Sequence, residues 1–234
     1  MKRNVLILHF LPAVFCTTFF FSCKKDEATL PSGRSGDLLD LIRYSTTANS
    51  GGFVKYLEEV AKTANASQLS CGTYADTTLT GNGSGSLTPY TYSIRIRRQL
   101  ICLGGAPLRL DFPVQGTHKF ETFRLRTGGN VNMANTIEGL TTGDANWRFT
   151  TRYSLNGPVL AKFTEKVFNH TIIFSTDNLL IEKTSSKIAG GTAGVEIQFQ
   201  ESGDPVAVYS ANITFHGKNR ATIQFEGNNY QLHW

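Results

Sequence analysis

Apolar and polar residues alternate strictly through much of the chain after about residue 90. The alternation covers segments 90–97, 108–114, 147–155 and 195–200, and it returns in 209–215, 221–225 and 230–234. Because successive side chains of a strand point to opposite faces of a sheet, a period of two predicts strands with one buried and one exposed face. No segment after about residue 70 has helical periodicity, so the strands should pair as antiparallel neighbours.

Glycine, asparagine and proline mark the turns between these strands. The expected turns are Asn156-Gly157-Pro158, Ser202-Gly203-Asp204, Gly217-Lys218-Asn219 and Gly227-Asn228-Asn229. The last three strands form a meander whose final residue, Trp234, is a candidate for the core. The predicted fold is therefore mainly β: an antiparallel meander of about eight to ten strands that forms a barrel-like or sandwich domain over residues 71–234.

Two short helices are expected before the sheet, within residues 37–70. Asp37 can cap the first helix, and apolar residues recur at helical spacing from Phe53 to Ala64 in the second. Glu58 stands four residues before Lys62, the spacing at which opposite charges pair on an exposed helix face. The apolar stripe of these helices predicts packing on the sheet or, alternatively, a lid over a ligand cavity.

The N-terminus has the layout of a secretory signal. Lys2 and Arg3 precede an uncharged run, 4–21, that is rich in Leu, Val and Phe, and Ser22-Cys23 ends it. Cleavage would remove residues 1–22, although the run also approaches the length of a membrane-spanning helix, so an uncleaved anchor is the alternative. Residues 23–36 contain few apolar side chains and predict a flexible tether.

Ser22-Cys23 resembles the end of a bacterial lipobox, in which the cysteine is acylated and becomes the mature N-terminus. Lys24-Lys25-Asp26-Glu27 is similar to the signal that directs some lipoproteins of Bacteroidota to the outer face of the outer membrane. Cys71-Gly72-Thr73, Asp76-Thr77-Thr78 and segment 221–234 resemble small β-rich lipoproteins of the same bacteria. The resemblance implies lipidation at Cys23, a location at the cell surface and O-glycosylation at Asp76-Thr77-Thr78, but no activity.

Cys71 and Cys102 are the two cysteines that remain after the signal and Cys23. In an oxidising envelope compartment such a pair predicts a disulfide. Neither cysteine has a C-x-x-C neighbour or a nearby histidine, which disfavours a metal or redox site.

Arginines are concentrated in the middle of the chain. Eight of the eleven that follow Cys23 lie within residues 90–155. Arg95 with Arg97, and Arg148 with Arg152, stand at even spacing, so each pair should share one face of a strand. These four arginines predict a cationic face that binds an anionic glycan through bidentate hydrogen bonds. The alternative is a solvated outer face that prevents strand pairing between molecules.

Patterns of catalytic or metal-binding residues are weak. His216 and His233 lie near the ends of neighbouring strands, but not at a common metal spacing. Asp111 and Glu121 would have to face each other across a hairpin to act as a glycosidase pair. The glycine-rich segment 81–86 lacks the remaining residues of a phosphate loop or a serine elbow and predicts a loop. We therefore expect no catalytic residue, metal or cofactor.

Together these features predict a non-enzymatic lipoprotein of the cell envelope, held on the membrane by a lipid at Cys23. It would act as a surface binding or interaction module for an anionic glycan, and exposed aromatics beside the arginines would favour this function. Removing residues 1–22 lowers the formal net charge from +5 to +3, which does not demand nucleic acid as a partner. The alternatives are a carrier with an apolar ligand among Ile94, Phe149 and Phe225, and a hydrolase.

Overall fold

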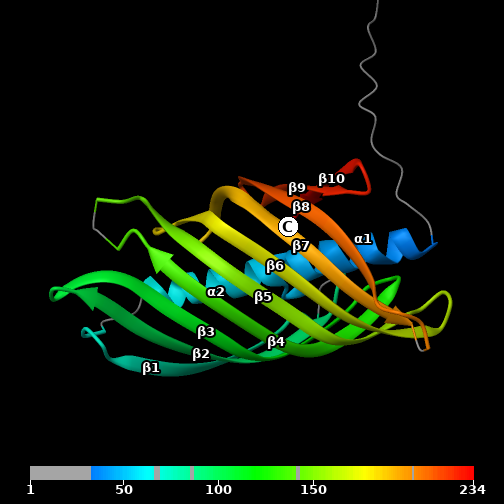
Figure 1. Cartoon of the computed structure of the whole chain (residues 1–234), viewed down its shortest axis with the longest axis horizontal. Coiled ribbons are helices and arrows are strands. Elements are labelled where there is room, and N and C mark those ends of the chain that lie inside the picture. The colour runs from blue at the N-terminus through cyan, green and yellow to red at the C-terminus, as the bar shows by residue number, and fades with distance from the viewer. Residues whose placement is uncertain (1–32, 66–68, 85–86, 141–142, 202) are drawn as a thin grey trace, which may run out of the picture.

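A single antiparallel sheet of ten strands, each paired with the next in sequence, dominates the structure (Figure 1). The structure is a computed structural model that describes residues 33–65, 69–84, 87–140, 143–201 and 203–234. The predicted signal peptide, Cys23 and most of the predicted tether lie outside the described residues. The elements are α1 (Gly33–Thr46), the 3-10 turn η1 (Ala48–Ser50), α2 (Phe53–Asn65), β1 (Tyr74–Asn82), β2 (Tyr90–Leu103), β3 (Ala106–Glu121), β4 (Leu125–Glu138), β5 (Asn146–Ala161), β6 (Lys166–Glu182), β7 (Ile188–Glu201), β8 (Ala207–Gly217), β9 (Arg220–Phe225) and β10 (Asn228–His233).

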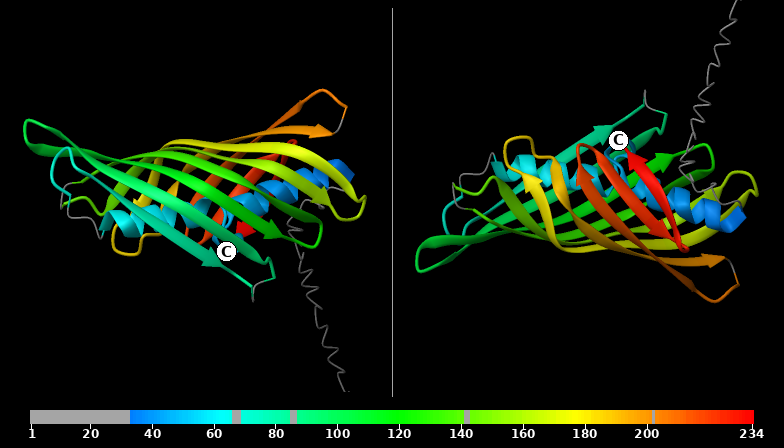
Figure 2. Two further views of the ribbon diagram at one scale, coloured as in Figure 1. Left: turned by 90° about the horizontal axis from the view of Figure 1, so that it is seen from below. Right: turned by 90° about the horizontal axis from the view of Figure 1, so that it is seen from above.

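The sheet is strongly curved, and the two helices lie inside its curve (Figures 1 and 2). Within the described part of the chain, the end strands β1 and β10 do not pair with each other, so the sheet is not closed into a barrel. The predicted antiparallel meander with two short helices is confirmed. The helices cover the concave face, where a sandwich would have its second sheet.

Helix α2 fills the centre of the concave side. The Phe53 ring stacks on Phe174 of β6 with the ring centroids 5.0 Å apart, and the Tyr56 ring lies 5.5 Å from that of Tyr153 of β5. All four side chains are fully buried. The apolar stripe of α2 therefore packs on the sheet. The residues proposed to line a carrier cavity, Ile94, Phe149 and Phe225, belong to the same core.

The end of the chain joins this core less completely than expected. Tyr230 and Leu232 of β10 are buried, as the alternation predicts. Trp234 is only half-buried and packs edge-to-face on Phe215, with the ring centroids 6.2 Å apart. It follows the last ladder pair of an end strand, so one side of its ring stays open to solvent.

Helix α1 begins at Gly33, four residues before the predicted boundary, and residues 33–36 therefore do not belong to a flexible tether. Tertiary contacts hold this first turn. Arg34 forms an ion pair with Glu201 at 3.2 Å, and Ser35 donates a hydrogen bond to Glu226. Asp37 lies inside the helix and accepts a hydrogen bond from Arg124, so its predicted capping role is wrong.

The predicted turn at Asn156-Gly157-Pro158 is also wrong, because β5 continues through it to Ala161. Gly157 faces Gly129 of β4, and a side chain on either glycine would collide with the opposite backbone. Glycine inside a strand is typical of positions where another backbone approaches this closely. The turns at Gly203-Asp204 and Gly217-Lys218-Asn219 are confirmed, and the last turn is centred on Glu226-Gly227.

Cys71 and Cys102 form a disulfide, as predicted. The bond joins the segment before β1 to the end of β2. Strand β1 was not predicted, because its sequence has no regular alternation of apolar and polar residues; none of its residues is fully buried, and only Leu79 packs against the core.

Helices α1 and α2 have 14 and 13 residues, and no helix of the described residues is long and apolar enough to cross a membrane.

Candidate functional site

A cleft of about 580 Å³ opens between the two edges of the curved sheet, the β1 edge and the β10 edge. Its floor comes from the helices, one wall from the β1–β2 connection and the start of β2, and the other wall from β10. The helices contribute Arg43, Tyr44, Lys55 and Glu58, the β1–β2 side contributes Gly83, Thr88 and Tyr90, and the opposite side contributes Leu232, His233 and Lys187.

Three cations and one carboxylate line this cleft. The Glu58 carboxylate is buried and accepts a hydrogen bond from Lys187 Nζ at 2.8 Å, so these two charges compensate each other. Lys55 forms an ion pair with Glu59, one turn further along α2, at 2.9 Å. Across the described ranges, no carboxylate lies within 4.0 Å of the Arg43 guanidinium. The half-buried Arg43 interacts with the Asp40 carboxylate of its own helix from beyond that distance, so of the three cations it is the one without a direct ion pair.

The Tyr90 ring forms part of the wall and is held in place by two glycines. Gly51 and Gly83 lie so close to this ring that a side chain on either one would collide with it. Gly51 also has a φ of +70°, a left-handed conformation that glycine adopts without strain. Tyr90 stacks in parallel on Tyr92, with centroids 6.3 Å apart. The phenol ring is thus held in a fixed position beside the cations.

Glu58 differs from its predicted role as a surface partner of Lys62. Lys62 instead pairs with Glu59 at 3.2 Å, and Glu58 turns inward to Lys187, which precedes β7. Since Glu58 and Lys187 are 129 residues apart in sequence, helical spacing could not predict the pair.

The four predicted ligand-binding arginines form two separate pairs. Arg95 and Arg97 of β2 both contact the Asp76 carboxylate of β1, at 2.6 and 3.2 Å. Hydrogen bonds from Arg95 and Arg97 hold the pKa of the Asp76 carboxyl below its usual range. Arg148 and Arg152 both lie on β5. The Arg148 guanidinium is 3.9 Å from the Glu138 carboxylate, and Arg152 donates a hydrogen bond to the Ser175 hydroxyl. Because β3 and β4 separate β2 from β5, the pairs are about 14 Å apart at the usual strand spacing.

Tyr74 lies beside the first arginine pair. Its side chain is 66% exposed, and the Arg97 guanidinium lies 5.4 Å above its ring. Arg95 and Arg97 also line a small groove of about 150 Å³, together with Pro113 and Gln115. An exposed aromatic beside arginines is the feature expected of a glycan-binding face. Asp76-Thr77-Thr78 lies in β1 beside it, and its glycosylation stays a prediction.

The weak catalytic candidates do not come together. Asp111 and Glu121 both lie on β3, ten residues apart, so they cannot face each other across a hairpin and stand about 33 Å apart along the strand. His216 bonds to Thr222 Oγ1, and His233 lines the cleft. Over the described ranges, no group of three or more His, Cys, Asp or Glu residues could hold a metal ion.

His118 is buried behind the cleft. Its Nε2 lies 2.9 Å from the Ser50 carbonyl oxygen, to which it donates in the neutral form. Burial lowers the pKa of His118 to about 4. The unfolded chain takes up the proton near pH 6.5, so protonation favours unfolding between these values. The contribution of neutral His118 to the free energy of unfolding is complete above about pH 6.5, and it is lost as the pH falls to about 4.

We expect acidification from pH 7 to pH 4 to lower the free energy of unfolding of the natural chain by about 3 kcal/mol more than that of His118→Gln. Glutamine keeps an amide donor for Ser50 but does not titrate. Urea unfolding at a series of pH values measures the difference. His170, whose pKa burial also lowers to about 4, is present in both proteins and cancels. Equal pH dependence of the two proteins would contradict the prediction.

The cleft residues Arg43, Lys55 and Lys187 were not predicted as functional. None of them belongs to a motif, and only the curvature of the sheet brings α1, α2 and the start of β7 to one opening. The alternation in segment 90–97 did predict that the Tyr90 side chain lies on the inner face of the sheet.

In comparisons with protein-family models, curated proteins and solved structures, nothing matches this chain. Its function has to follow from the chemistry of the cleft and of the N-terminal segment.

Proposed function

We propose that this chain is a membrane-anchored binding protein of the cell envelope, and that it holds an acidic oligosaccharide in the cleft between the β1–β2 connection and β10. The observation that carries the proposal is the cleft itself, in which three cations, Arg43, Lys55 and Lys187, converge beside the rings of Tyr44 and Tyr90. The protein would bind this ligand without catalysing a reaction.

The sequence supports anchoring at the N-terminus. Lys2-Arg3, the uncharged run and Ser22-Cys23 have the order of a lipoprotein signal, and Lys24-Lys25-Asp26-Glu27 is similar to the surface-export signal of Bacteroidota. The Cys71–Cys102 disulfide suits an oxidising compartment outside the cytoplasm. We therefore propose a lipid on Cys23 and display on the outer face of the outer membrane.

The chemistry of the cleft suits a sugar that carries carboxylates. The planar guanidinium of Arg43 can donate two parallel hydrogen bonds to one carboxylate, and Lys55, which pairs with Glu59, supplies a second cation. Tyr44 and Tyr90 present rings and hydroxyls, which suit the mixed apolar and polar faces of a pyranose ring. A ligand of two or three sugar units fits a cleft of about 580 Å³.

The groove beside Tyr74 is a second candidate for the same ligand class. There the arginines share one carboxylate, Asp76, and the exposed ring stands next to Arg97. The groove has a volume of only about 150 Å³ and its two arginines are paired with Asp76, so the larger cleft is the better candidate.

Two observations favour a binding module over the alternatives. The side chains that a carrier would present to an apolar ligand are buried in the packed core. The carboxylates of the hydrolase hypothesis are engaged by cations instead: Asp111 by Arg109, and Glu121 by Arg126 and Lys162.

Neutralising the cleft should abolish most of the binding. We expect Arg43→Gln with Lys55→Gln to weaken the affinity for a galacturonic acid trimer at least about tenfold, because each charge-assisted hydrogen bond contributes about 1.5 to 3 kcal/mol. Isothermal titration calorimetry measures the affinity, and a neutral galactose trimer is the matched ligand control.

Two control variants remove the same charge elsewhere. Arg148→Gln with Arg152→Gln, and Arg95→Gln with Arg97→Gln, should leave the affinity within about twofold, since surface charges more than a Debye length from the cleft are screened. Loss of binding in either control, with none in the cleft variant, would move the site to the convex face. No binding of the acidic trimer by the natural chain would refute this ligand class.

A further inference from the structure

Exposed apolar side chains gather at one end of the sheet. Because the strands alternate in direction, the β1–β2, β3–β4, β5–β6 and β7–β8 turns all lie at the same end. Of the nine large apolar side chains that are exposed in the described part, six lie at or next to these turns and three lie toward the other end. The six are Leu87, Phe123, Phe163, Val167, Val206 and Val208.

Phe123 and Phe163 form an aromatic pair at this end. They are 81% and 61% exposed, and their rings meet edge-to-face with centroids 5.0 Å apart. The Arg124 guanidinium lies 5.6 Å above the Phe163 ring and donates hydrogen bonds to Asp37 and to the Gly33 carbonyl oxygen. The aromatic pair is therefore tied to the first turn of α1.

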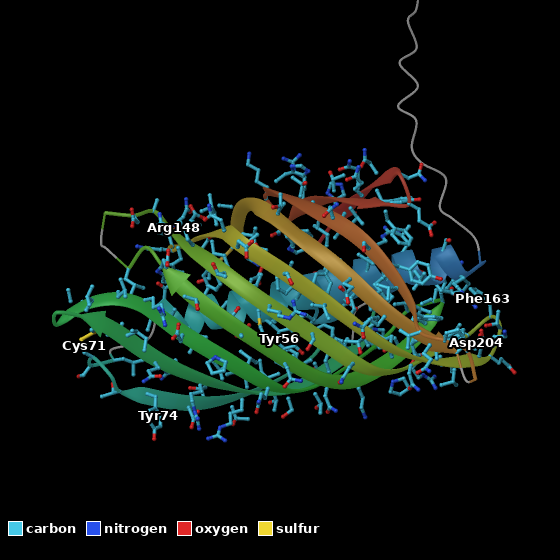
Figure 3. The ribbon with its side chains drawn as sticks, in the orientation of Figure 1. Tyr56, Cys71, Tyr74, Arg148, Phe163 and Asp204 are labelled. Atoms are coloured by element: carbon cyan, nitrogen blue, oxygen red, sulfur yellow. A yellow bond between two sulfur atoms is a disulfide. The ribbon has the colours of Figure 1, made fainter. Side chains whose placement is uncertain are left out.

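The N-terminal segment enters at this same end. Arg34 and Ser35 contact Glu201 and Glu226, which lie at the ends of β7 and β9. Figures 1 and 3 show the start of α1 beside Phe163, at the end of the molecule opposite Cys71. Strands of up to 17 residues, about 55 Å long, separate the two ends.

The length of the N-terminal segment limits the distance to the membrane. Ten residues, 23–32, separate the proposed anchor at Cys23 from Gly33. Even fully extended, they span at most about 35 Å. An anchor at Cys23 therefore keeps the Phe123 end near the bilayer.

We infer that Phe123 and Phe163 dock this end of the domain onto the lipid bilayer by entering its interfacial layer. The inference rests on the N-terminal anchoring in the proposed function and adds a second contact, which would orient the domain. Exposed phenylalanine side chains are typical of surfaces that lie in this layer, where the apolar ring enters the boundary between headgroups and acyl chains. The long strands then point away from the membrane.

This contact depends on apolar groups and not on charge. The nearby cations already form ion pairs. Arg126 and Lys162 pair with Glu121, and Lys166 and Arg34 pair with Glu201. Docking should therefore be insensitive to salt and should occur on zwitterionic phosphatidylcholine without anionic lipid.

The test uses the anchored protein isolated from membranes and reconstituted into phosphatidylcholine vesicles. Phe123→Trp and Phe163→Trp place a fluorophore on the docking turns, and Tyr74→Trp places one at the opposite end. All three positions are exposed, so tryptophan should not disturb folding. We expect brominated acyl chains to quench the added emission at 123 and 163, at low and high salt alike, and to leave the added emission at 74 unquenched.

Flotation with the vesicles reports anchoring separately. Protein that floats while the emission at 123 and 163 stays unquenched would overturn the docking inference and leave the anchoring intact. Equal quenching at 123 and 74 would also overturn it, because the domain would then lie without a preferred end. Protein that does not float would remove the anchoring and the inference with it.

Discussion

Replacing Phe53 by alanine is expected to lower the free energy of unfolding by about 3 to 5 kcal/mol. The side chain is fully buried between α2 and the sheet, where it stacks on Phe174 and also contacts Tyr153. Alanine would leave a cavity between rigid rings, and such surroundings relax only partly. Urea unfolding followed by circular dichroism measures the loss.

Phe123→Ala is the matched control, because it removes the same atoms from an exposed turn. We expect its free energy of unfolding to stay within about 0.5 kcal/mol of the natural chain. If Phe53→Ala were as stable as Phe123→Ala, α2 would not fill the curve of the sheet. The interior would then be open to a ligand, as the carrier hypothesis requires.

Removing the disulfide by Cys71→Ser with Cys102→Ser is expected to cost about 3 to 4 kcal/mol, because the bond closes a loop of 31 residues in the unfolded chain. The native structure should loosen first at β1. None of its residues is buried, so the strand depends on its ladder with β2, on the Asp76 ion pairs and on this bond.

Two measurements check the disulfide prediction. Urea unfolding gives the loss of stability, and the natural chain under reducing conditions should match the serine variant. Hydrogen exchange should show faster exchange in β1 than in central strands such as β5. Unchanged protection of β1 in the variant would show that the ladder with β2 suffices.

The alternation of side chains predicted most of the sheet because it is a local property. In β7, Val195, Ile197 and Phe199 are buried while Glu196 and Gln198 face outward. A period of two depends only on the pleat, so distant residues cannot change it. The antiparallel order followed from the short connections between the strands.

Prediction failed where a distant contact overrode a local signal. Asn156-Gly157-Pro158 has the composition of a turn, yet the close approach of Gly129 keeps it in a strand. Residues 33–36 look like a linker, yet Glu201, Glu226 and Arg124 hold them in a helix. Glu58 pairs with Lys187 because the curvature of the sheet brings the start of β7 to α2.

The sequence did not predict the candidate site, because this site too depends on contacts between distant residues. Even spacing correctly placed Arg95 with Arg97, and Arg148 with Arg152, on shared strand faces, but the distance between the two pairs depends on the strands between them. The cleft around Arg43 exists only because β1 and β10 stay apart while the helices close the space beneath them.

The linear order of residues alone thus determined the strands, their inward and outward faces, the helical stripe and the cysteine pair, since each depends on near neighbours or on simple counting. Tertiary structure decided the curvature, the open edge, the charge pairs of the cleft and the aromatic end beside Gly33. These depend on how ten strands coil around two helices, and the small twist at each strand pair accumulates across the whole sheet.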